Sequence, residues 1–407
     1  MTIPVNMTLT VALGVLVYIF GQKIVDRVEF LQKYCIPAPV VGGLIFSVIH
    51  LIGVQTGTFA FEFDQTLKDF FMIGFFATIG FSASLRIIKQ GGIAIVILFI
   101  VSSIMLIIQN VWGVAIARAF DLHPLIGMCA GSISLMGGVG SSAAFAPIME
   151  SNGATGGLTV AIASATFGLV MGGLVAGPVA RFLIDRYKLV EKAAVTNTGN
   201  EIDYSELEIE DDEPEIIKTK DLSTGFFILM LAMGIGSIIS MLINATGLVF
   251  PAYVGAIFAA AFIRNIADSR NKELPHKEIS AIGNIFLNIF LAMTIMSLEI
   301  WEIAGMALPL IVILIGQVIL LIIFAILVVY TTTGRDYDAA VMSAGFYGYA
   351  MGATPNAMAS MNAVVERYGR PSPKAFFTVP IVGGFLMDFS MAILIIGHMN
   401  LILKGIL

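Results

Sequence analysis

Ten runs of apolar residues, each long enough to cross a lipid bilayer as a helix, decide what this chain can fold into. A crossing helix needs roughly 20 predominantly apolar residues. Charged residues make up 12% of the chain, against about 25% in soluble domains. We therefore expect an all-α polytopic membrane protein. The runs occupy residues 5–21, 37–54, 68–85, 92–117, 157–180, 222–243, 250–265, 280–298, 307–330 and 376–399.

Two further apolar stretches, 124–149 and 339–362, are interrupted by glycine and proline. These residues break helices at such density. Irregular backbone at membrane depth is tolerated only inside protein or beside a water-filled cavity. We expect each stretch to enter the membrane and return to the same side, as re-entrant hairpins at 121–150 and 336–366.

The distribution of basic residues predicts the orientation of the chain, because inner loops of membrane proteins are enriched in lysine and arginine. With two re-entrant hairpins and the N-terminus outside, only Lys68, Arg118 and Lys404 of the 22 basic residues fall on the outer side. Treating both hairpins as full spans gives a much weaker bias. We expect a protein of the cell inner membrane with both termini outside.

One long polar segment, 187–221, divides the chain and carries 11 of its 28 acidic residues. Its composition is that of a solvated linker, and the predicted orientation makes it cytoplasmic. The segment separates two units of five spans each, at 1–186 and 222–407.

The two units resemble each other at an offset of about 214 residues. Pro37 matches Pro251, and Gly138 matches Gly352, at the same place in each expected hairpin. A shared offset indicates an internal repeat. Because five spans are an odd number, the second repeat is inverted in the membrane. Inverted repeats with broken segments that meet near the midplane indicate a secondary transporter.

The tips of the two hairpins offer hydroxyl groups, amides and free backbone without a fixed charge. Half-helix N-termini suit a carboxylate, and unwound carbonyls with hydroxyl oxygens suit Na⁺. Glycine and serine also serve simply to let membrane helices pack closely. The residues that we expect to contact the substrate are Ser132, Ser134, Gly138, Gly140, Ser141, Ser142, Tyr347, Gly352, Thr354 and Asn356.

Asp388 stands at the centre of the span 376–399, whereas every other acidic residue lies at a span end, in a loop or in the linker. A carboxyl group inside the membrane usually marks an ion or proton path. We expect Asp388 to coordinate a cation or to carry a proton, and the alternative is a protonated carboxyl group in a structural hydrogen bond. Of the cations, we expect Na⁺ as the coupling ion. Further oxygens would come from Gly137, Ala353 and Thr166. Gln109 and Asn110, deep in 92–117, either bind substrate or join helices.

Several motifs of this chain are those of a known family. They include Phe-Ala-Thr-Ile-Gly at 76–80, Gly-Ser-Ile-Ser-Leu-Met-Gly-Gly at 131–138, Gly-Ala-Thr-Pro at 352–355, and Asp388. Over nearly its whole length the chain resembles the bacterial glutamate:sodium symporter family. The resemblance implies ten spans in two inverted repeats and Na⁺-coupled uptake of L-glutamate. It also implies a homodimer that works by an elevator-like movement.

The chain departs from the family pattern among the expected substrate contacts. The family's first hairpin reads Gly-Gly-His-Gly-Thr-Gly, where residues 137–142 read Gly-Gly-Val-Gly-Ser-Ser. The second commonly has His-Cys at Phe346-Tyr347, and threonine at Asn356. These changes leave open that another small organic anion is carried.

Other classes of function fit the sequence less well. A sodium/proton antiporter also uses inverted repeats and broken helices, but only one carboxyl group stands inside a span. An intramembrane hydrolase would need a histidine, lysine or second aspartate to activate a hairpin serine. A passive channel would conduct without saturation or coupling. No basic stripe for nucleic acid is present, and we do not expect an enzyme.

Overall fold

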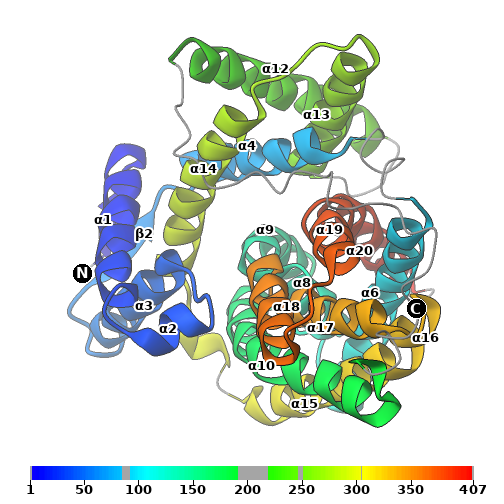
Figure 1. The fold of residues 1–407 in the computed structure, drawn as a ribbon. Coiled ribbons are helices and arrows are strands. Elements are labelled where there is room, and N and C mark those ends of the chain that lie inside the picture. The colour runs from blue at the N-terminus through cyan, green and yellow to red at the C-terminus, as the bar shows by residue number, and fades with distance from the viewer. Residues whose placement is uncertain (1, 85–91, 191–218, 246–250, 304, 406–407) are drawn as a thin grey trace.

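The computed structural model describes residues 2–84, 92–190, 219–245, 251–303 and 305–405 and is almost entirely helical (Figure 1). Eight of the described helices are long and apolar enough to cross a membrane. The chain is therefore a polytopic α-helical membrane protein, as predicted. The expected linker 187–221 lies largely outside the described residues.

The first half begins with a short strand that is followed by a helix capped by Asn6, whose side chain accepts a hydrogen bond from the Leu9 amide at 3.0 Å. Strand β1 pairs with β2 in a two-stranded parallel sheet, which is the one described departure from an all-α fold. The elements are β1 (Thr2–Val5), α1 (Met7–Val25), α2 (Glu29–Lys33), α3 (Ala38–Gln55), β2 (Ala60–Phe63), α4 (Thr66–Ser82), α6 (Gly92–Ala119), α7 (Pro124–Cys129), α8 (Ser132–Leu135), α9 (Gly138–Ser151) and α10 (Gly157–Tyr187).

The second half contains two long helices that are each interrupted by a π-helical turn, η3 and η4. Such turns often occur at functional sites. The elements are α12 (Thr219–Asn244), α13 (Ala252–Ser269), α14 (His276–Met296), η2 (Ile300–Ile303), α15 (Ala307–Phe324), η3 (Ala325–Val329), α16 (Tyr330–Thr332), α17 (Tyr337–Met351), α18 (Thr354–Tyr368), α19 (Pro373–Ile381), η4 (Val382–Leu386) and α20 (Met387–Leu403).

Each of the ten predicted apolar runs coincides with a helix. Eight of these helices are the long apolar ones, whereas α4 and α13 have 17 and 18 residues. Lys68 lies in the first turn of α4, and Arg264 lies near the end of α13. Polar residues at these ends shorten the apolar part of the two helices.

The helices form two groups (Figure 1). The framework group contains α1, α3, α4, α12, α13 and α14, and the broken-helix group contains α6–α10 with α15–α20. The framework group thus takes the first three long helices of each half. The broken-helix group takes the remaining helices of each half, including all the interrupted ones.

Corresponding glycines join the helices of the framework group. A Cβ atom at Gly21 would overlap the carbonyl of Ala38, so α1 and α3 are in backbone contact. Gly236 meets Gly255 in the same way, which joins α12 to α13. Prolines at equivalent positions, Pro37 and Pro251, precede α3 and α13 with the same extended backbone.

Contacts between the two halves are reciprocal within the framework group. Gly43 of α3 lies against Ile295 of α14, and Gly80 of α4 lies against Ile257 of α13. Residues 43 and 257 are 214 positions apart, which is the offset of the sequence repeat. Residues 80 and 295 are 215 positions apart and so also correspond. The second contact therefore joins the same two positions as the first, with the first and second halves of the chain interchanged.

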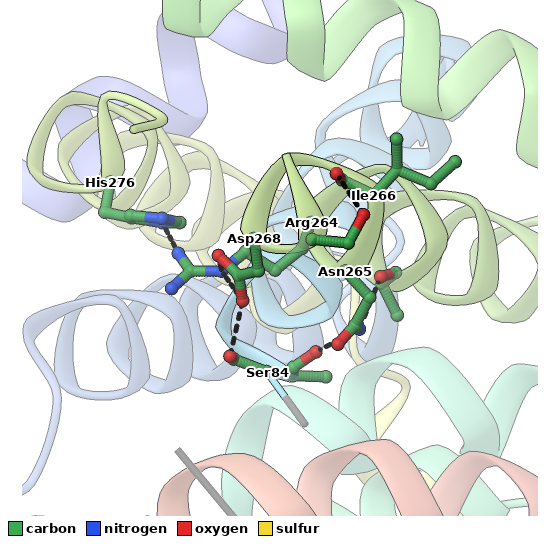
Figure 2. Close-up of polar contacts among 9 residues, drawn as sticks. Ser84, Arg264, Asn265, Ile266, Asp268 and His276 are labelled. Atoms are coloured by element: carbon green, nitrogen blue, oxygen red, sulfur yellow. Dashed lines mark hydrogen bonds and ion pairs between the residues drawn. The ribbon is translucent and has the colours of Figure 1, made fainter. Parts of the chain in front are cut away.

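A polar network fixes the end of α4 against α13 and α14 (Figure 2). The Arg264 guanidinium contacts Asp268 at 2.9 Å and the His276 Nδ1 atom at 2.8 Å. The Ser84 hydroxyl donates to the other Asp268 oxygen at 2.5 Å. Asn265 donates to the carbonyl of the residue before Ser84 at 2.8 Å. These bonds tie α13 to the end of α4 and to the start of α14.

Candidate functional site

Two short non-helical segments, one in each half, form the centre of the candidate site. The first break is residues 136–137 between α8 and α9, and the second break is residues 352–353 between α17 and α18. Gly138 adopts φ +63°, which favours glycine. Ala353 has an extended backbone and Pro355 stands in the first turn of α18, where proline is tolerated.

The two breaks are in contact with each other. A Cβ atom at Gly138 would lie 3.0 Å from the carbonyl oxygen of Gly352. Helix α10 passes beside them, with Gly168 against the carbonyl of Met351. Glycine at these positions allows three backbone segments to meet, which side chains would prevent.

Two helix N-termini begin at this meeting point. Helix α9 starts at Gly138 and α18 starts at Thr354, and neither first turn has a side-chain cap. The first turns of a helix carry unpaired N–H groups and a partial positive charge. In α18 this leaves the Thr354 N–H, because Pro355 has no N–H and the Asn356 N–H donates to the Ala353 carbonyl at 3.0 Å. The predicted residues Gly140, Ser141 and Asn356 lie in these turns. The local chemistry therefore favours an anion.

A chain of buried amide side chains supports both breaks. Asn110 accepts from the Ser132 hydroxyl at 2.6 Å, next to the first break. Gln109 donates to the carbonyl of Ala350 at 3.0 Å, next to the second. Gln317 of α15 donates to the Gln109 carbonyl at 2.8 Å. Helices α6 and α15 thus hold the two breaks from one side.

Several buried polar atoms of the broken-helix group have no hydrogen-bond partner among the described residues. Buried polar groups are normally paired, so an unpaired group indicates a missing water, ion or ligand. The group contains donors and acceptors. The atoms are Gln109 Oε1, Asn110 Nδ2, Gln317 Oε1, Tyr347 Oη and Thr378 Oγ1.

Asp388 is the second residue after the π-helical turn η4, and the residues one turn before and after it contact residues at the two breaks. One turn before it, Gly384 faces the Thr354 hydroxyl, 3.5 Å from the position of a Cβ atom. One turn after it, Met391 lies against Gly137. Asp388 is partly exposed and has no hydrogen bond or ion pair with another described residue. Its carboxyl group is available for a cation.

Other predicted residues bond to backbone carbonyls. The Ser142 hydroxyl donates to Gly138 at 2.8 Å, and the Asn356 amide donates to Leu169 of α10 at 2.8 Å. Ser134 donates to the carbonyl of Gly131 at 3.2 Å. Thr166 donates within α10, at 2.9 Å, two residues before the contact with Met351. These hydroxyl and amide groups hold backbone in place, and their oxygens can still accept from or coordinate a ligand.

Sequence reasoning missed Gln317 and Thr378 and left Gln109 and Asn110 undecided. The signal for Gln317 was available, because it is an isolated amide in the apolar run 307–330. Thr378 gave no such signal, since threonine is common in membrane helices and bonds to its own backbone there.

The chain matches known transporters over most of its length. The family model described as "Sodium/glutamate symporter" matches residues 3–370. A sodium/glutamate symporter of Escherichia coli (strain K12) is 37% identical over 391 residues, 95% of each chain. One of Haemophilus influenzae is 38% identical over 389 residues, again 95% of each chain. The chain therefore belongs to the sodium/glutamate symporter family.

Proposed function

We propose that this protein carries L-glutamate across the cell inner membrane by symport with Na⁺. The observation that carries the proposal is the contact between Gly138 and Gly352, with Asp388 beside it. Two uncapped helix N-termini and one carboxyl group meet there, which suits an anion and a cation together. The names of the E. coli and H. influenzae relatives supply the choice of glutamate and sodium.

The proposal includes two inverted repeats, 1–186 and 222–407, with re-entrant hairpins at 121–150 and 336–366. The reciprocal contacts of Gly43 with Ile295 and of Gly80 with Ile257 support this symmetry. Both termini then lie outside and the linker is cytoplasmic. Residues 138 and 352 lie on the pseudo-two-fold axis, near the membrane midplane.

In this proposal the substrate is held by the first turns of α9 and α18. N–H groups of the first turn of α9, together with the Thr354 N–H of α18, bind the carboxylates of glutamate. Asn110 Nδ2 and Tyr347 Oη are unpaired donors for the same groups, while Gln109 Oε1 and Gln317 Oε1 accept from its ammonium group. Unpaired donors for the carboxylates and unpaired acceptors for the ammonium group of an amino acid are therefore both present in the broken-helix group.

Na⁺ is the second cargo and binds to oxygen atoms. Asp388 supplies the charged ligand, and the carbonyls of Gly137 and Ala353 with the Thr166 hydroxyl supply neutral ones. A sodium ion here favours the nearby carboxylate of the substrate electrostatically. Because binding couplings are reciprocal, glutamate raises the affinity for Na⁺ by the same factor. That mutual enhancement is the basis of symport.

Alternating access follows from the division into two groups of helices. The broken-helix group carries the whole candidate site, and the framework group contributes none of the residues named in it. We propose that the broken-helix group moves across the membrane against the framework group, in an elevator-like way. The resemblance to the family extends this proposal to a homodimer.

The test is uptake of radiolabelled L-glutamate into proteoliposomes, with and without an inward Na⁺ gradient. We expect saturable uptake that requires the gradient and is competed by unlabelled L-glutamate. D-glutamate, aspartate, glutamine and citrate define the specificity. No glutamate uptake, with one of these competitors carried instead, would reject glutamate and keep the symport. Proton movement driven by Na⁺ alone would reject symport in favour of antiport.

A further inference from the structure

A basic cleft between α10 and α18 is not used by the candidate site. It has a volume of about 740 Å³. Its residues on α18 follow the second break by 11 to 16 positions, which is roughly 16–24 Å along a helix. The cleft is therefore separate from the meeting point of the two breaks. Its wall includes Pro178, Arg181, Phe182, Arg186, Val364 and Arg367.

The cleft combines an apolar floor with a positive rim. On α10, residues 178, 181, 182, 185 and 186 share one helix face, and on α18, residues 363, 364, 367 and 368 share another. Phe182 is 52% exposed although it stands next to two arginines. An amphiphilic surface of this kind matches a ligand with an anionic head and an apolar body.

The positive charge of the rim is only partly neutralised within the protein. Arg181 contacts Asp185 at 3.4 Å, and both side chains are more than half exposed. Arg186 and Arg367 form no ion pair with any described residue. Arg186 and Arg367 stand in the last turns of α10 and α18, where a positive charge also stabilises the helix dipole. The dipole does not explain why the two arginines line one cleft.

The cleft lies between α10 and α18, and hydrogen bonds join these two helices. Tyr368 of α18 donates to Asp185 of α10 at 2.6 Å. Further along, the Asn356 amide donates to Leu169 at 2.8 Å. Both bonds link the helix after the second break to α10. A ligand in the cleft would strengthen the same link.

We propose that this cleft binds the headgroup of an anionic phospholipid. The arginines contact the phosphate, for which their planar donor groups are suited. The acyl chains follow the exposed apolar faces of Phe182 and Pro178 into the bilayer. Basic pockets between membrane helices at the inner surface bind such headgroups. The lipid fixes α18 to α10 and thereby the second break.

The experiment uses the purified full-length protein in a neutral detergent and does not require a transport assay. Phosphatidylglycerol or phosphatidylcholine is added, and the midpoint of thermal unfolding is followed by intrinsic fluorescence. Native mass spectrometry counts the lipids that remain bound. We expect phosphatidylglycerol, but not phosphatidylcholine, to raise the midpoint by at least about 3 °C.

Matched variants locate the effect. Arg186→Gln with Arg367→Gln should lose the retained lipid and most of the shift, whereas Arg270→Gln, an exposed arginine outside the cleft, should keep both. Arg186→Lys with Arg367→Lys keeps the charges and should restore at least half of the shift, so a folding defect in the glutamine variant is recognised. An equal shift in the glutamine and wild-type proteins would overturn the proposal.

The carboxylates of the acidic residues between 201 and 215 are the alternative ligand of the cleft, since they could contact the same arginines as a lipid phosphate. A variant with these acids changed to their amides should leave retention of phosphatidylglycerol unchanged or increase it. If it instead lowers the unfolding midpoint as much as the arginine variant does, without any added lipid, the acidic segment and not a lipid occupies the cleft.

Discussion

Gly138 and Gly352 are in contact although about half of the chain separates them, with the Cβ position of the first 3.0 Å from the carbonyl oxygen of the second. The two residues are also equivalent in the sequence repeat. A residue can contact its own symmetry partner only near the symmetry axis. Under the proposed two-fold repeat this contact would mark the centre of the molecule, and side chains cannot be added there without separating the two breaks.

Substituting Gly138 should impair transport more than stability. Gly138→Ala places a Cβ on a left-handed residue, which costs roughly 1 kcal/mol or more, and moves the Gly352 carbonyl away. We expect at least about a fivefold lower initial rate of uptake. Gly397→Ala is the control, because nothing lies within 4 Å of its Cβ position. Equal rates for the two variants would contradict the role of the contact.

Asp388 should be required for sodium dependence. Asp388→Asn removes the charge and keeps the shape of the side chain, so the folded protein should be recovered in normal amount. We expect it to lose Na⁺-dependent uptake. The exposed Glu273→Gln should behave like the wild type. Normal dependence of uptake on Na⁺ concentration in Asp388→Asn would show that the carboxyl group does not bind the coupling ion.

The bond between Asn110 and Ser132 should be measurable as a coupling energy. Thermal unfolding of Asn110→Ala, Ser132→Ala and the double variant forms a double-mutant cycle. A buried hydrogen bond contributes about 1 kcal/mol, and somewhat less on average in membranes. We expect a positive coupling of about that size. Additive effects of the two substitutions would mean that the 2.6 Å contact does not hold the first break.

Cys35 tests the orientation of the chain. It stands between α2 and α3, outside the membrane helices, and is partly exposed, whereas Cys129 is fully buried. We expect a membrane-impermeant maleimide to label Cys35 in inside-out vesicles and not in intact cells. Labelling that occurs in intact cells and disappears in Cys35→Ser would place this segment outside.

The pH dependence of this labelling has a definite sign. Burial raises the pKa of the Cys35 thiol above its ordinary value. The thiolate is the reactive form, so labelling at pH 7 is slow and rises as pH approaches the raised pKa. We expect close to a tenfold increase per pH unit in that range. Labelling that levels off by about pH 8.5, the ordinary thiol pKa, would contradict the raised pKa.

The sequence predicted the helices well and the site in part. Apolar runs of fixed length have few alternatives in a bilayer, so all ten coincide with helices. Glycine and proline located the breaks at residues 136–137 and 352–353, because each of these residue types changes the backbone conformations allowed at its own position. The prediction that the two glycine-rich segments would meet agrees with the contact between Gly138 and Gly352.

What the sequence could not supply is the set of contacts between distant helices. The amide chain from Gln317 through Gln109 to Ala350 depends on how α6, α15 and α17 pack, and no local pattern encodes that packing. The paired strands β1 and β2 were missed for the same reason. Four residues near a helix start do not reveal a partner 58 positions away.

The reciprocal packing of the framework group has a consequence for how the protein is assembled. Because α3 packs on α14 and α4 packs on α13, each half buries faces that only the other half can cover. A half made alone would present these surfaces to lipid or to other copies. Two halves made as separate polypeptides, divided within residues 191–218, would instead cover each other's apolar faces. The covalent link between the halves would then matter more during synthesis than for the stability of the finished fold.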